Sequence, residues 1–133
     1  MPEVLLDPDI EQLLVADLPA RLAAHGFTGI TVATKPRTGE SVALFRTGGP
    51  RATLVSDRPQ VTFDSRAATE TRAGNIARIV RGVVLALPGE VLDGHQVYQV
   101  EEFTGPANLP DPNYTGARYR WTASIHIRSH PAA

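Results

Sequence analysis

The residues from 117 to 128 constrain the fold of this chain most, because apolar and polar side chains alternate along them without interruption. A period of two is the pattern of a β-strand that buries one face and leaves the other polar. The apolar positions are Tyr119, Trp121, Ala123, Ile125 and Ile127, and the polar positions are Arg118, Arg120, Thr122, Ser124, His126 and Arg128. The run therefore predicts a strand with its tryptophan in the core and an arginine-rich face turned away from the core.

A second alternating strand is predicted at residues 60–66. Val61 and Phe63 fall on one side of it, while Asp64 and Arg66 fall on the other. If this strand neighbours the first, Asp64 and Arg66 extend the arginine-rich face by cross-strand pairing.

Two helices are predicted from apolar residues at helical spacing. The helix at residues 68–87 has an apolar arc made of Ala73, Ile76, Ala77, Val80, Val83, Val84 and Leu87. We expect this arc to pack on the sheet while Arg78 and Arg81 face away. The helix at residues 9–25 begins at an aspartate cap, and its Pro19 should kink or divide it.

The other segments are short strands and loops. Strands are predicted at residues 30–34, 41–49 and 97–103, and residues 51–59 form a short strand or an irregular excursion. Loops are predicted at residues 35–40 and 104–116, and residues 129–133 look frayed. With one helix between strands, we expect an α+β fold: a mostly antiparallel sheet of about four to five strands, with two main helices packed on one face. The length suits one domain, residues 1–133.

Composition excludes several function classes. The formal net charge of −1 argues against a nucleic-acid binder, because such proteins concentrate positive charge. The chain has no cysteine, which excludes disulfides, thiolate zinc sites and a cysteine nucleophile. No window approaches the roughly 18 apolar residues of a membrane span, and the first residues lack a signal-peptide pattern. We therefore expect a protein made in the cytoplasm, with no membrane partner.

No catalytic or metal-binding pattern emerges from the sequence. The glycine-rich pieces RTGGPR and LPGEVLDG do not match a phosphate-binding loop, and no G-x-S-x-G motif is present. The serines have no obvious base nearby in sequence. The four histidines, His25, His95, His126 and His130, read as solvated surface residues. We expect no catalytic, cofactor or metal residues, and no enzyme.

Four elements, taken in order, resemble tail terminator proteins of long-tailed, non-contractile bacteriophages, especially those of actinobacteria. They are the acidic N-terminal helix DPDIEQLLVADLPARL; the R-x-G-G element at residues 46–49; the D-R-P element at residues 57–59, which leads into VTFDSRA and the long helix; and the closing GP…LPDPN…RY segment at residues 105–119. Together they span most of the chain.

The resemblance implies a structural virion protein without cofactor. Such proteins form a ring, commonly hexameric, at the head-proximal end of the tail, where they end tube polymerisation and provide the surface that joins the head. The implied partners are further copies of the chain, the major tail tube protein and a head-completion protein, with DNA only as the genome passing through the ring. A ring needs a heterologous interface, for which residues 35–40 and 104–116 are candidate contact arms. The candidate subunit-contact residues are Arg46, Asp57, Arg58, Asp64, Arg66, Asp111, Asn113, Arg118 and Arg120.

Three alternatives stay open. The chain is equally suited in size to a head-completion or neck protein, either stopper or connector. A small-molecule-binding or enzymatic α+β domain would require an apolar pocket with convergent polar groups. A DNA-binding module would have to use the arginine strand despite the net charge.

Overall fold

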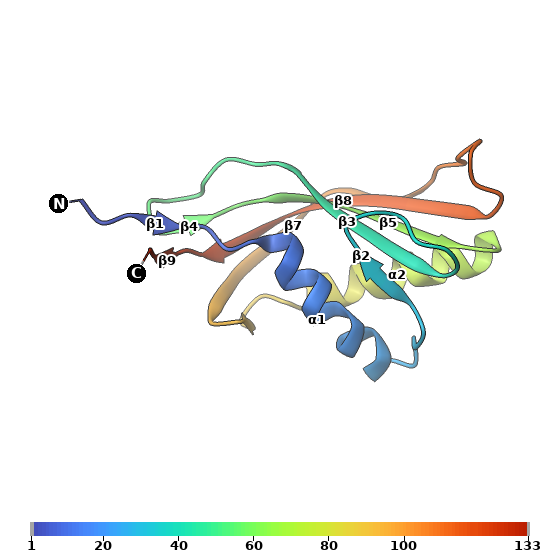
Figure 1. The fold of residues 1–133 in the computed structure, drawn as a ribbon, viewed down its shortest axis with the longest axis horizontal. Helices are drawn as coiled ribbons and strands as arrows, with labels where there is room; N and C mark the ends of the chain where they lie inside the picture. The colour runs from blue at the N-terminus through green and yellow to red at the C-terminus, as the bar shows by residue number, and fades with distance from the viewer. Residues whose placement is uncertain (1, 133) are drawn as a thin grey trace.

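The protein is described by a computed structural model that covers residues 2–132 (Figure 1). Its elements are β1 (Leu5–Leu6), α1 (Ile10–Ala24), β2 (Thr31–Ala33), β3 (Ser41–Gly48), β4 (Ser56–Asp57), β5 (Gln60–Ala67), α2 (Glu70–Leu85), β6 (Val91–Leu92), β7 (His95–Asn108), β8 (Ala117–Arg128) and β9 (His130–Pro131). Neither helix is long and apolar enough to cross a membrane within these residues.

Seven strands form one curled, mixed sheet. Its order is β2-β3-β5-β8-β7-β6, with β4 paired to β8 beside this path, while β1 and β9 form a separate two-stranded sheet. β2 runs parallel to β3, and the other paired strands run antiparallel. The expectation of a mostly antiparallel sheet of four to five strands is therefore wrong.

The physical reason lies in the length of the extra strands. β2 has three residues, which is about 10 Å of extended chain. The loop at residues 34–40 is long enough to return the chain to the start of β2, so β3 can pair parallel to β2 without the helical crossover that normally indicates parallel pairing. β4 and β6 have two residues each, too few to show any periodicity in the sequence.

Both helices lie on the same side of the sheet (Figure 1). Asp9 caps α1, since its side chain accepts a hydrogen bond from the Gln12 backbone N–H, and α1 runs through Pro19 as one uninterrupted helix. Thr69 caps α2 in the same way, with the Arg72 N–H as donor. Of the two predicted outcomes at Pro19, a kink or a division, the division of α1 is not observed.

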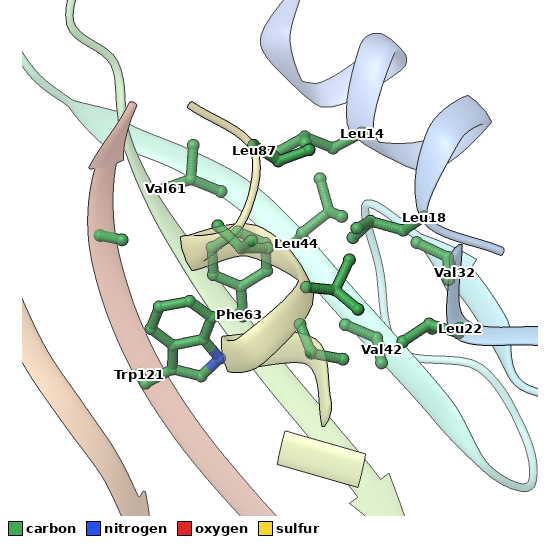
Figure 2. Packing of buried hydrophobic residues seen from close by; sticks show 14 of the residues in the cluster. Leu14, Leu18, Leu22, Val32, Val42, Leu44, Val61, Phe63, Leu87 and Trp121 are labelled. Atoms are coloured by element: carbon green, nitrogen blue, oxygen red, sulfur yellow. The ribbon is translucent and has the colours of Figure 1, made fainter. Parts of the chain in front are cut away.

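The core fills the space between the helices and the sheet (Figure 2). The seven residues predicted as the apolar arc of the second helix are all buried, and Trp121 is completely buried. Trp121 stacks on Phe63 of the neighbouring strand, with 4.6 Å between ring centroids. These positions confirm the predicted register of β8 and the predicted rotation of α2.

Two loop predictions need correction. β7 continues to Asn108, so residues 104–108 pair with β8 and the loop shrinks to residues 109–116. Residues 129–132 are not frayed: Ser129 is 3% exposed and donates a hydrogen bond to Asp7, and the next two residues form β9. Ala133 lies outside the described residues.

Candidate interaction surface

The sheet face opposite the helices carries a charged cluster around Asp64. The β5–β8 register places Asp64 directly opposite Arg120, and Arg66 directly opposite Arg118. This confirms that the two alternating strands are neighbours and share one polar face. Because successive side chains of a strand point to opposite faces, this face excludes the Phe63–Trp121 stack and is separated from the core by the sheet itself.

Asp64 is 2% exposed and lies close to three arginines. Its carboxylate is 3.1 Å from Arg120 Nη2, 3.6 Å from Arg66 Nη2 and 3.8 Å from Arg118 Nε. Of these three contacts, only the one between Asp64 and Arg120 has the geometry of a hydrogen bond. Asp64 Oδ1 and the Nε atoms of Arg66 and Arg120 are buried and have no hydrogen-bond partner in residues 2–132. The ion pairs therefore offset the free-energy cost of burying the charged carboxylate of Asp64.

The loop at residues 109–116 contributes a second carboxylate to this cluster. Asp111 lies 3.3 Å from Arg66 and 3.7 Å from Arg118, and it accepts a hydrogen bond from the Asn113 backbone N–H. That hydrogen bond, together with the two arginines, lowers the pKa of Asp111. The guanidinium of Arg66 also lies over the ring of Tyr114 at 4.9 Å. Three guanidinium groups thus face two carboxylates, which leaves one positive charge in excess.

The R-x-G-G and D-R-P elements contact each other. Arg46 Nη1 lies 2.8 Å from the buried carboxylate of Asp57, and the same guanidinium donates to the carbonyl oxygens of Gly48 and Gly49. Gly49 has a φ of +100°, and a Cβ there would lie 2.3 Å from the Arg58 carbonyl oxygen, so this close approach requires glycine. The two elements therefore close the base of the segment between β3 and β4.

The remaining candidate residue, Arg58, is exposed, and no carboxylate in residues 2–132 pairs with it. The structure thus gathers Asp64, Arg66, Asp111, Asn113, Arg118 and Arg120 in one cluster and joins Arg46 to Asp57 in another.

Sequence reasoning missed a serine–histidine contact. Ser56 Oγ lies 2.7 Å from His126 Nε2, although these two residues are 70 positions apart, and it also lies 2.7 Å from Thr53 Oγ1. A nucleophile must be reachable by its substrate, and Ser56 is 2% exposed, with Thr53 on its other side. Burial, with Arg58 as a lesser cause, lowers the pKa of His126, which favours a neutral ring. The contact therefore acts as a fastening between β4 and β8.

Two of the other histidines, His95 and His130, form more contacts than the sequence indicates, whereas His25 is exposed as expected. His95 and His130 stack with ring centroids 3.8 Å apart, and each has a ring nitrogen within 2.9 Å of a backbone carbonyl oxygen, of Arg128 and Gly94 respectively. They fix β9 to the start of β7. Among residues 2–132, no three histidine, aspartate or glutamate side chains are placed to hold a metal ion.

Two ion pairs fasten the helix α2 to its surroundings. Arg81 pairs with Glu102 of β7, and Arg72 pairs with Glu40 at 2.7 Å, at the end of the loop at residues 35–40. Each arginine lowers the pKa of its glutamate partner. Arg78 is exposed as expected, but Arg81 is tied to the sheet and does not simply face solvent.

Comparison with known proteins gave no relative: no family model matches the chain, and no curated protein matches its sequence.

Proposed function

We propose that this chain is a structural virion protein that forms a ring at the head-proximal end of a phage tail tube. The ring ends tube polymerisation and offers the joining surface for the head. The four-element resemblance in the sequence motivates the proposal, and two of those elements, R-x-G-G and D-R-P, form one closed unit through Arg46 and Asp57.

The observation that carries the proposal is the polar face of the sheet. Both helices pack on the other side, so this face is free of helices throughout residues 2–132. It bears the arginine cluster around Asp64, with one positive charge in excess and the loop at residues 109–116 beside it. Positioned arginines on a helix-free sheet face are suited to recognising carboxylates of a neighbouring chain.

Tail assembly with and without the protein tests the proposal, with tail length and head joining scored by electron microscopy. Loss of the protein should give abnormally long tubes that fail to join heads. Substitution of the exposed Asn113 by Arg in the loop should mimic that loss in folded protein, whereas Arg at the exposed Ala23 of α1 should not.

Two results would contradict the proposal. Tails of normal length that still join heads would remove the virion-tail role altogether. Tails of normal length that fail to join heads would instead favour the head-completion or neck role.

A further inference from the structure

The segment between β3 and β4 ends in an exposed apolar turn. Residues 53–56 form this turn, and at its tip Leu54 is 82% and Val55 53% exposed. Leu54 is the most exposed large hydrophobic side chain among the described residues. An exposed leucine alone needs no explanation, so the inference depends on how the turn is held and on what surrounds it.

The apolar turn is held in place by several contacts with its own residues and with neighbouring strands. A β-bridge joins Thr53 to Ser56, Thr53 Oγ1 accepts from the Val55 N–H at 3.1 Å, and the Val55 carbonyl accepts from the Ser129 N–H at 2.9 Å. The Ser56–His126 contact fastens the turn to β8, and the Arg46–Asp57 pair closes its base. Such a turn loses little conformational entropy on binding, which is what a preorganised contact requires.

Two arginines lie beside the apolar turn, and Glu3 lines the same hollow as Val55 and Arg128. Arg58 lies two residues after it, beyond the paired Asp57, and Arg128 pairs in register with Ser56. Both arginines are exposed, and neither forms an ion pair with any residue in the described part of the chain. The turn therefore presents two apolar side chains beside two arginines.

An acidic groove of about 470 Å³ lies between α1 and the turn after β6. Leu13, Ala16 and the 56% exposed Val91 give it apolar walls. Three carboxylates line it as well: Asp9, Asp17 and Asp93. Of these, only Asp17 forms an ion pair within residues 2–132, with Arg21. The groove thus combines apolar walls with negative charge, the complement of the apolar turn.

We infer that the apolar turn of one copy of this chain inserts into the acidic groove of a second copy. The inference rests on the proposed ring, because it names the contact between neighbouring subunits. Leu54 is too exposed to fill the groove of its own chain. The turn at residues 53–56 and the groove beside α1 share no residue, so the two patches are unlike. Two unlike complementary patches make a heterologous contact, which is the kind that builds rings.

Light scattering across a concentration series tests the contact. Leu54→Asp and Val91→Arg should each weaken self-association roughly tenfold or more, because they place a charge in an apolar contact. Phe103→Asp is the matched control, since Phe103 is 69% exposed but lies outside both patches. Assembly of Leu54→Asp with the same midpoint as the unmodified chain would overturn the inference and leave the ring proposal standing.

A mixture of the two variants distinguishes a heterologous contact from any other. Leu54→Asp keeps an intact groove and Val91→Arg keeps an intact turn, so an equimolar mixture should form dimers through one good contact but no larger species. A mixture that stays monomeric would contradict the contact.

Cross-linking locates the contact directly, because the chain has no cysteine of its own. Leu54→Cys mixed with Val91→Cys and oxidised with diamide should give a disulfide-linked dimer, whereas either variant alone should give much less. A disulfide requires the two Cα atoms to lie within about 7 Å, so the link reports the contact itself. Linked dimers without larger assemblies would support the contact and contradict the ring. Absence of both linking and assembly at the highest concentration would overturn the contact, and tail assembly would then decide on the ring alone.

Discussion

Phe63 and Trp121 stack across neighbouring strands, with ring planes 15° from parallel, and both side chains are fully buried. Trp121→Ala should destabilise the fold by about 3–5 kcal/mol, because it leaves a cavity beneath α2. Trp121→Phe should cost less, since it keeps an aromatic ring and removes a buried indole N–H that has no hydrogen-bond partner in residues 2–132. Urea unfolding followed by circular dichroism measures both variants. An unchanged midpoint for Trp121→Ala would contradict the assignment of this stack as the centre of the core.

Asp64 is predicted to be the most sensitive residue of the polar face. Asp64→Ala leaves three arginines close together without their buried carboxylate, so it should cost about 3–5 kcal/mol. Asp111→Ala should cost clearly less, because that carboxylate lies in the loop and solvent reaches it. The comparison is made by chemical denaturation at constant salt. Equal losses for the two variants would show that the cluster does not depend on Asp64.

Charge reversal on α2 should separate two neighbouring arginines. Arg78→Glu should change stability by less than about 1 kcal/mol, because Arg78 is exposed and has no ion-pair partner among the described residues. Arg81→Glu should lower the thermal midpoint more, since it replaces an attraction to Glu102 by a repulsion. The double variant Arg81→Glu, Glu102→Arg should recover part of that loss. A larger effect at Arg78 than at Arg81 would mean that the rotation of α2 is wrong.

Stability should fall as the pH drops below the ordinary pKa of histidine, about 6.5. The folded state lowers the pKa of His126, so below pH 6.5 the unfolded chain takes up a proton there more readily than the folded chain. The stabilising contribution is complete above pH 6.5 and is lost as the pH falls toward the folded-state pKa. His126→Gln keeps a polar side chain beside Ser56 but does not titrate. In this variant the unfolding midpoint should depend less steeply on pH between pH 7 and pH 5. An identical slope in that variant would contradict this role of His126.

Long periodic elements could be predicted from the sequence, and short ones could not. β8 and α2 each have enough residues for an alternating or helical pattern to identify the apolar side that packs in the core. β5 alternates in the same way between apolar and polar residues, but the structure buries both of its faces from Val61 to Ala67. β4, β6 and β9 have two residues each and exist only because a neighbouring strand pairs with them. The strand count and the parallel pairing of β2 are tertiary outcomes of this kind, and for that reason the expected sheet was wrong.

The candidate surface shows the same division. The pairing of Asp64 with Arg120 follows from strand alternation once the two strands are neighbours. The contacts of Ser56 with His126 and of His95 with His130 join residues far apart in the sequence, without a motif that could reveal them. The contact between Arg46 and Asp57 is partly predictable. Both residues belong to short elements that the sequence singles out, but only the fold brings the two elements together.

The contacts among Arg46, Gly49 and Asp57 hold the base of the segment between β3 and β4 independently of the side chains at its tip. Position 49 tolerates only glycine, and the arginine–aspartate pair must stay, but nothing in the base depends on which side chains occupy positions 54 and 55. Natural or designed variation can therefore change the tip while the frame holds it in the same place. The side chains at these two positions can therefore change without cost to the core.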